Sequence, residues 1–215
     1  MSGIQQLLMA GGQAPKVLEY LSVQLDNVDR TTYTFSGVSI GTASSDRRII
    51  VTVGNTNTTL ISSATVGGVS ATIIVQRVSG GGNAFAGVLI ANVPTGTTAD
   101  IVITFAAGVS NCKAGVYSST GLLSDTATDT GFSDSNPGSD TLTVIPGGFC
   151  VGACSMLDFA LASPSWTALT VHYSEEQENG VSSGASTSLI SGTSISPSVD
   201  YQTAGTTCTV VFATF

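Results

Sequence analysis

Apolar and polar residues alternate in short runs along most of the chain, and turns rich in glycine, proline and asparagine separate the runs. This pattern predicts about a dozen short strands after residue 16. Such strands with frequent turns are typical of a β-sandwich or jelly roll, so we expect an all-β fold. The expected strands are 17–23, 31–35, 48–53, 60–66, 69–75, 84–93, 99–105, 114–118, 141–145, 149–156, 168–173, 185–190 and 207–215.

One hairpin has a particularly clear signal. The runs 60–66 and 69–75 are rich in β-branched residues, and only Gly67 and Gly68 separate them. A two-residue turn of this kind requires positive φ angles, which glycine adopts without steric cost. The sequence therefore predicts a β-hairpin centred on these two glycines.

The segment 123–139 (LSDTATDTGFSDSNPGS) interrupts the strand pattern. We expect a single β-sandwich domain over residues 17–215, with a long loop around 123–139, because neither flanking block clearly closes a sandwich by itself. Two alternatives remain open. The segment could link two small domains, or it could form a polar edge strand whose charges discourage aggregation.

The first 16 residues differ from the rest and are expected to form an anchor. Ile4, Leu7, Leu8 and Met9 make a short apolar face that ends at Gly11–Gly12. A helix of this length is marginal in isolation, so we expect these four residues to bind a neighbouring chain. The alternative interpretation is a frayed terminus.

Composition and charge exclude several classes of protein. The chain is 42% apolar and only 9% charged, which is the opposite of a disordered protein. Its net charge is −8 with six basic residues, so it lacks the basic stripe that nucleic-acid binding requires. No apolar run approaches the roughly 20 residues of a membrane-spanning helix. The N-terminus also lacks the basic region of a secretory signal, which favours assembly in a reducing cytoplasm.

Candidate catalytic and metal-binding residues are few. The one histidine, His172, could act as a base, but no G-x-S-x-G motif supplies a nucleophile. The carboxylates of 175–178 could serve a glycosidase, but the chain has only one Trp and five Tyr to line a carbohydrate cleft, so a solvated loop is the favoured interpretation. The run 134–140 resembles a calcium loop but lacks the EF-hand ligands at the required positions. We therefore expect no catalytic site, no cofactor and no dedicated metal site, and an irregular surface calcium site at 134–140 stays open as an alternative.

The four cysteines lie within apolar or β-branched strings. Cys150 and Cys154 are four residues apart, which on a strand places them about 13 Å apart on one face. That separation is too large for a disulfide or a shared metal ion. We expect Cys112, Cys150, Cys154 and Cys208 to be buried free thiols.

Several strand-and-turn segments carry a resemblance to a known class of protein. These segments are 1–8, 33–41, 48–53, 61–69, 93–101 and 208–215. Together they resemble uncharacterised virion structural proteins of tailed bacteriophages. The resemblance covers most of the chain, and no functional residues carry over because its motifs are strands and turns.

The resemblance implies a non-enzymatic structural component of a virion, assembled in the cytoplasm of a bacterial host. A tail- or fibre-associated protein is favoured, and a head decoration or cement protein is the close alternative. Its partners would be other virion proteins and further copies of itself in a symmetric homo-oligomer. A glycan-binding module for host attachment is an alternative of a different class, since concave β-faces and loop tips can bind sugars.

Overall fold

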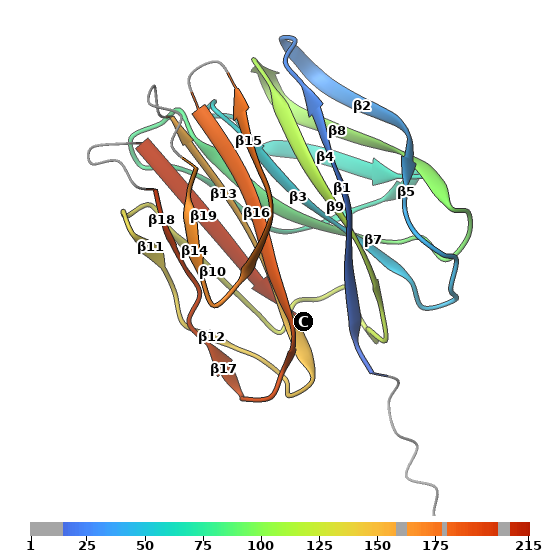
Figure 1. Cartoon of the computed structure of the whole chain (residues 1–215). Coiled ribbons are helices and arrows are strands. Elements are labelled where there is room, and N and C mark those ends of the chain that lie inside the picture. The colour runs from blue at the N-terminus through green and yellow to red at the C-terminus, as the bar shows by residue number, and fades with distance from the viewer. Residues whose placement is uncertain (1–14, 158–162, 178–179, 202–206) are drawn as a thin grey trace, which may run out of the picture.

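The computed structural model describes residues 15–157, 163–177, 180–201 and 207–215, and these fold into antiparallel β-strands (Figure 1). The first half of the chain contains β1 (Val17–Asp26), β2 (Arg30–Ser39), β3 (Arg48–Asn55), β4 (Ile61–Val66), β5 (Val69–Ser70), β6 (Thr72–Val78), β7 (Phe85–Asn92), β8 (Thr98–Val109) and β9 (Cys112–Thr120). The second half contains β10 (Asp129–Ser133), β11 (Gly138–Ser139), β12 (Leu142–Thr143), β13 (Gly148–Leu157), β14 (Ser165–Thr167), β15 (Thr170–Gln177), β16 (Gly180–Ile190), β17 (Ser194–Ile195), β18 (Ser198–Asp200) and β19 (Thr207–Thr214).

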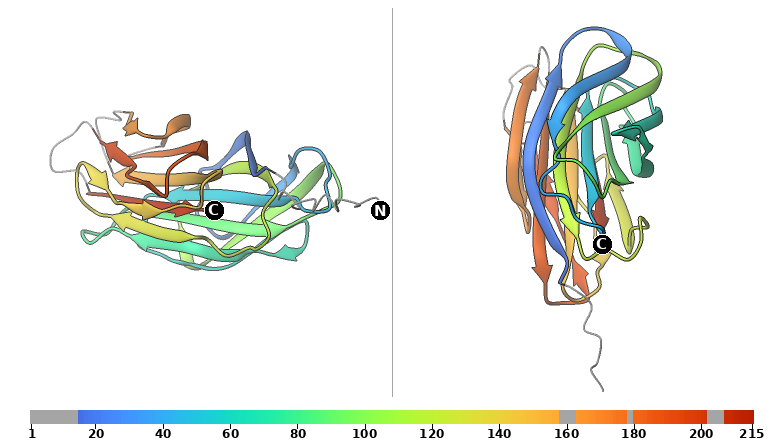
Figure 2. Two further views of the ribbon diagram at one scale, coloured as in Figure 1. Left: turned by 90° about the horizontal axis from the view of Figure 1, so that it is seen from below. Right: turned by 90° about the vertical axis from the view of Figure 1, so that its right-hand side faces the viewer.

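Each half of the chain builds one inner sheet and an outer layer. The first inner sheet has the order β1-β9-β3-β7-β6, and β2-β8-β4-β5 covers it. The second inner sheet has the order β10-β19-β13-β16-β15, and the short sheets β11-β18-β14 and β12-β17 cover it. The two inner sheets pack face to face, so the layers form a stack that is visible from two sides in Figure 2.

Strand β3 shows how the sequence produces this stack. Its run RIIVTV is apolar at nearly every position, and successive side chains of a strand point to opposite faces. Ile49 and Val51 pack into the core against the first outer sheet, whereas Ile50 packs into the core between the two inner sheets. A strand buried on both faces needs a continuous apolar run rather than an alternating one.

The same alternation builds the second inner sheet. Phe149 and Val151 of β13 face the first half of the chain, and Cys150 and Cys154 face the outer layer of the second half. The structure therefore has three stacked cores. The middle core joins the two halves, because it draws its side chains from both inner sheets.

Polar contacts also cross between the inner sheets. The Ser155 Oγ donates a hydrogen bond to the Asn55 carbonyl at 2.8 Å. The Lys113 Nζ donates to the Glu175 carbonyl at 2.6 Å, and the Lys113 side chain is fully buried. A buried polar group is stabilised only when it has a partner, so these contacts fix how one sheet lies on the other.

The predicted all-β sandwich is confirmed, and most expected strands appear close to their predicted positions. The hairpin turn at Gly67 and Gly68 is also present, with φ angles of 59° and 78°. Its second arm is shorter than expected, however. After Ser70 the chain leaves β4, and β6 joins the first inner sheet beside β7.

The span 123–139, expected as a long loop, contains two short strands. β10 pairs with β19 at the edge of the second inner sheet, as the edge-strand alternative anticipated. β11 pairs with β18 in the outer layer. The first 14 residues, including the expected short helix, lie outside the described residues, and the single-domain hypothesis stays a prediction.

Candidate interaction surface

The predicted anchor residues Ile4, Leu7, Leu8 and Met9 lie outside the described residues. The structure does describe the surface that adjoins this segment. Lys16 precedes β1 and lines an open hollow of about 150 Å³ at that end of the molecule. We call this hollow the Leu123 groove.

The Leu123 groove brings together residues that are far apart in the sequence. Its lining includes Lys16, Leu122, Leu123, Thr128, Ile145 and Phe215. Leu123 is 81% exposed and Ile145 is 54% exposed, and Leu123 has the largest exposed fraction among the large apolar side chains that the structure describes. Val17, next in sequence to Lys16, is 52% exposed. An apolar hollow with exposed aliphatic side chains on its rim is typical of an interaction site.

Leu123 is exposed because the residue before it, Leu122, points into the core. Leu122 is 5% exposed and packs into the core between the two inner sheets, where Phe215 also lies. Phe215 contacts Phe149 with their ring centroids 5.3 Å apart. Leu122 and Phe215 therefore form the fixed floor of the groove, and the chain presents Leu123 outward.

Hydrogen bonds hold the connection between the two halves in place. The Gly121 amide donates to Asp46 Oδ2 at 2.8 Å. The Arg48 Nε lies 2.7 Å from Asp125 Oδ1, and the Thr128 amide donates to the Thr214 carbonyl at 2.7 Å. These bonds fix the chain before and after Leu123, so the groove is a preformed feature of the surface.

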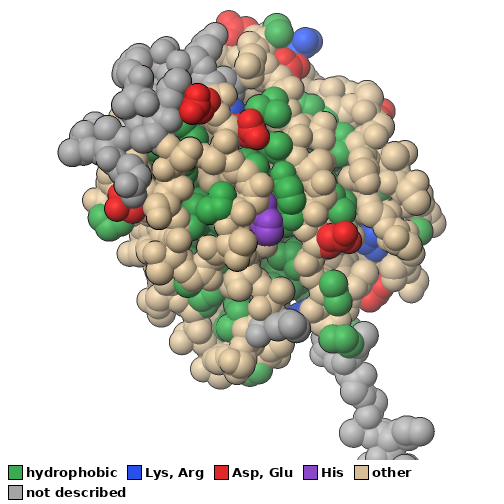
Figure 3. Space-filling view, viewed as in Figure 1, with side chains coloured by type: hydrophobic (Ala, Val, Ile, Leu, Met, Phe, Trp, Pro, Cys, Tyr) green, Lys and Arg blue, Asp and Glu red, His purple; other side chains and the backbone are tan. Residues whose placement is uncertain are grey.

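His172 has a serine partner that the sequence did not indicate. Its Nε2 lies 2.8 Å from the Ser186 Oγ, and its ring stacks on Tyr20 with centroids 4.9 Å apart. The structure places His172 at an irregularity in the pairing of β15 with β16, between Val171 and Tyr173. The histidine reaches the surface, where it is the purple side chain in Figure 3.

The surroundings of this serine–histidine pair do not favour nucleophilic catalysis. Ser186 is only 7% exposed and lies within β16, which pairs with strands on both sides. An oxyanion hole needs backbone N–H groups aimed at the reacting atom, and those of paired strands are engaged in the sheet. Burial lowers the pKa of His172, which weakens it as a base. His172 instead connects the edge strands of the two inner sheets, because it lies on β15 and stacks on Tyr20 of β1.

The two acidic residues after His172 that the structure describes do not converge. Glu175 and Glu176 are consecutive on β15, so their side chains point to opposite faces of the strand. Glu178 lies outside the described residues. The pair therefore does not form the facing carboxylates that glycosidase chemistry requires.

The residues that resembled a calcium loop have other partners. Asp134 pairs with Arg77 at 2.6 Å and accepts a hydrogen bond from the Thr209 hydroxyl at 2.9 Å. Asn136 Oδ1 accepts a hydrogen bond from the Tyr201 amide at 3.1 Å. Among the described residues, no group of three or more histidine, cysteine, aspartate or glutamate side chains is arranged to hold a metal ion.

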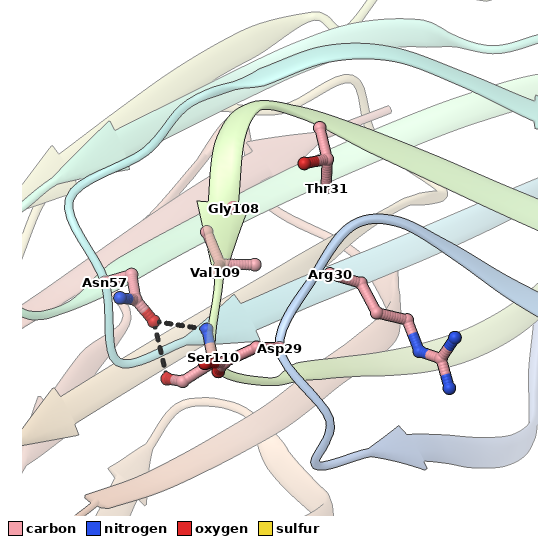
Figure 4. Close-up of a pocket in the computed structure, with 7 residues that line it drawn as sticks. All are labelled: Asp29, Arg30, Thr31, Asn57, Gly108, Val109 and Ser110. Carbon is pink, nitrogen blue, oxygen red and sulfur yellow. Dashed lines mark hydrogen bonds between the residues drawn. The ribbon is translucent and has the colours of Figure 1, made fainter.

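A larger and more polar hollow lies at another place on the surface. It has a volume of about 410 Å³ and is lined by Asp29, Arg30, Thr31, Asn57, Gly108, Val109 and Ser110 (Figure 4). The Asn57 side chain accepts hydrogen bonds from the Ser110 amide at 3.0 Å and from its hydroxyl at 2.7 Å. Asn57 therefore braces two loops, and the hollow offers mainly polar groups to a ligand.

Aromatic side chains are mostly buried. Of the aromatic residues that the structure describes, Phe132 alone is exposed, at 50%. The Arg77 guanidinium lies over its ring, 4.4 Å from the centroid. Sugar-binding sites commonly present flat aromatic faces, and this chain offers no exposed cluster of them in its described part.

The expectation of buried free thiols is confirmed, because Cys112, Cys150, Cys154 and Cys208 are all buried and unbonded to one another. Burial raises the pKa of Cys150 to about 12 and that of Cys208 to about 11. Thiols with raised pKa values carry little thiolate and are poor nucleophiles. The cysteines therefore serve as small apolar core residues.

Comparison with protein-family models, with curated proteins and with solved structures finds no match for this chain. Within the described ranges, no helix is long and apolar enough to cross a membrane.

Proposed function

We propose that the protein is a non-enzymatic structural component of a tailed bacteriophage virion and acts through protein–protein interfaces. A position in the tail or on a fibre is favoured, with head decoration as the alternative. The observation that carries the proposal is the Leu123 groove. Its exposed leucine and isoleucine surround a preformed hollow beside the start of β1, which is the kind of surface that a partner chain covers.

The buried part of the molecule supports the same role. The central strands β3 and β13 of the two inner sheets are covered on both faces, and even Arg47 and Lys113 are fully buried with hydrogen-bond partners. A rigid scaffold with few charged side chains suits repeated packing in a particle. The burial of Ser186 within a strand that is paired on both sides supports a role without catalysis.

The proposal is tested in particles of the phage that encodes the chain. A phage lacking the gene is complemented with the wild-type protein, with Leu123→Ser/Ile145→Ser or with Val28→Ser/Leu60→Ser. The last pair matches the first, because Val28 and Leu60 are 54% and 44% exposed and lie outside the groove. We expect the control to reach the wild-type copy number per particle and the groove variant to fall at least tenfold.

Immunogold labelling of the same particles distinguishes tail, fibre and head. Absence of the wild-type protein from purified particles would contradict the proposal. Treatment with a fluorophosphonate, followed by intact-mass measurement, tests the non-enzymatic role separately. We expect no labelling, and a stoichiometric adduct on Ser186 would instead indicate a hydrolase.

A glycan-binding module is the second candidate, and the polar hollow at Asn57 is the feature that favours it. Its hydroxyl, amide and carboxylate side chains are groups that bind sugar hydroxyls. The scarcity of exposed aromatic faces makes it the weaker candidate. Binding to host-surface polysaccharide that is lost on Thr31→Ala, but not on Leu123→Ser, would support it.

A further inference from the structure

We infer that the Leu123 groove receives residues 4–9 from a second copy of this chain. The inference rests on the proposed structural function and names the partner of the same surface. It would make the protein a self-assembling component, in which each copy supplies one arm and one groove.

The groove has the size and character to hold one large apolar side chain of a short segment, with the neighbouring side chains against its rim. Its volume of about 150 Å³ is comparable to cavities that hold one benzene-sized group. Leu122 and Phe215 supply an apolar floor, and Leu123 and Ile145 supply an apolar rim. Among the described residues that line it, Lys16 alone is charged.

The N-terminal segment matches this surface in composition. Residues 1–14 contain Ile4, Leu7, Leu8 and Met9 and have no charged side chain. Apolar side chains concentrated in a short segment gain most by burial against another apolar surface. Such a segment would bring no ionised side chain of its own into a groove whose floor and rim are apolar.

The position of the groove favours a second copy over the same chain. Lys16 lies on the groove, and residues 10–15 are the tether between it and residues 4–9, so the segment could reach its own groove only by reversing direction within these six residues. Pro15 disfavours a helical turn directly before it. The six residues 10–15 span roughly 20 Å when extended, at about 3.3 Å each, which is enough to reach a molecule that lies directly alongside.

An arm from one copy in the groove of the next is a head-to-tail contact. Contacts of this kind generate closed rings or open filaments according to the rotation between copies. Each contact buries few side chains and would be weak, but several in one assembly reinforce each other. The arrangement therefore suits a repeated virion component.

Two complementary variants of the full-length protein test the inference. The arm variant is Leu7→Ser/Leu8→Ser, which keeps the groove intact. The groove variant is Leu123→Ser/Ile145→Ser, which keeps the arm intact. Molar mass is measured by light scattering during size-exclusion chromatography over a range of concentrations, and circular dichroism verifies that each variant is folded.

We expect the wild-type protein to form species larger than the 21.6 kDa monomer and each variant alone to remain a monomer. An equimolar mixture of the two variants should form a species of twice the monomer mass and no larger one. In that pair, the intact arm of one variant occupies the intact groove of the other. Val28→Ser/Leu60→Ser should behave like the wild type.

Three results would overturn the inference. The wild type could be monomeric at every concentration, the groove variant could assemble normally, or the mixture could fail to form the pair. A monomeric wild type whose arm resists proteolysis, while the arm of the groove variant is cleaved, would show docking within one chain. Because these measurements use purified protein, particle incorporation of the wild type would still support the proposed function if the inference fails.

Discussion

The hydroxyl of Tyr173 lies 3.0 Å from the Thr52 Oγ1, and this hydrogen bond joins β15 of one inner sheet to β3 of the other. The Tyr173 ring fits between the sheets only because two facing positions are glycine. A Cβ atom on Gly115 would lie 2.3 Å from the Tyr173 Cε1, and one on Gly184 would lie 2.2 Å from it. Because Gly115 and Gly184 have no side chain, they leave the space that the Tyr173 ring occupies.

Replacing Gly184 with alanine should lower the free energy of unfolding by about 1–3 kcal/mol, because the added methyl group must displace the Tyr173 ring. Urea denaturation measures the change. Gly108→Ala is the matched control, since a Cβ there has no atom within 4 Å and its φ is not positive. The control should be neutral or slightly stabilising. Equal stabilities of the two variants would mean that Tyr173 is not held as described.

Lys113 should make stability depend on pH. Burial lowers its pKa from 10.5 to about 8, against the opposing effect of Glu175, Cys154 and Glu176. The unfolded chain then binds more protons than the folded chain between about pH 8 and pH 10.5, so the contribution of Lys113 to stability rises over that window. The difference of 2.5 units, from 10.5 to about 8, corresponds to roughly 3 kcal/mol.

Buried thiols and tyrosines lower the stability of the folded protein as the pH rises above about 9, which opposes the effect of Lys113. They are present in both the wild type and Lys113→Met, so the difference between the two proteins isolates the effect of Lys113. The stability of the wild type relative to the variant should increase as the pH rises from about 7 to 10. A constant difference across that range would show that Lys113 has an ordinary pKa in the folded protein.

Arg47 is expected to be the most sensitive basic residue. Its fully buried guanidinium donates hydrogen bonds to the carbonyl oxygens of Gly41, Val93, Thr95 and Gly96 at 2.7–2.9 Å. A lysine cannot reproduce that fork of donors. Arg47→Lys should therefore cost at least about 2–3 kcal/mol, because carbonyl groups are left without partners.

The neighbouring residue provides the control for this prediction. Arg48 makes fewer bonds: its side chain is 11% exposed, pairs with Asp125 and donates to the Asp46 carbonyl at 2.8 Å, so Arg48→Lys should cost less than Arg47→Lys, about 1–2 kcal/mol. Thermal unfolding followed by circular dichroism compares the two. A larger loss of stability in Arg48→Lys than in Arg47→Lys would contradict the prediction that the Arg47 hydrogen bonds hold the loops at Gly41 and at 93–96 together.

The two halves of the chain should unfold together. Their shared core includes Ile50 and Val88 from the first half and Val151 and Val211 from the second. Separating the halves would expose all of these side chains. Calorimetry should show one transition, coincident by fluorescence and circular dichroism. Two resolved transitions, or release of two folded fragments after cleavage within 123–128, would indicate two domains.

The sequence predicted the strands well but could not predict how the sheets stack. The run at 48–53 indicates burial on both faces, yet nothing in it specifies that Ile49 faces one sheet and Ile50 another. The hairpin glycines fix a local turn, whereas the change of sheet after Ser70 depends on packing against β7. Local stereochemistry is encoded in a few neighbouring residues, and pairing between distant strands is not.

The Leu123 groove could not be predicted from the sequence either. Leu123 begins a polar segment and has no periodic apolar neighbours, so only the fold shows that it lies beside Ile145 and Lys16. The Ser186–His172 contact also depends on the irregular pairing of β15 with β16. By contrast, the burial of the four cysteines followed directly from the apolar strings around them.

The cysteines give the last prediction. All four thiols are buried and unbonded, and burial raises the pKa of Cys150 and Cys208 to about 12 and 11. Because the thiolate is the reactive form, the folded protein should react with Ellman's reagent at pH 8 at none of its four cysteines on the timescale of minutes. Denaturation without reductant should release all four at once. Recovery of only two would reveal a disulfide, and rapid reaction of the folded protein would reveal an opening of the core around Cys208, the least buried of the four.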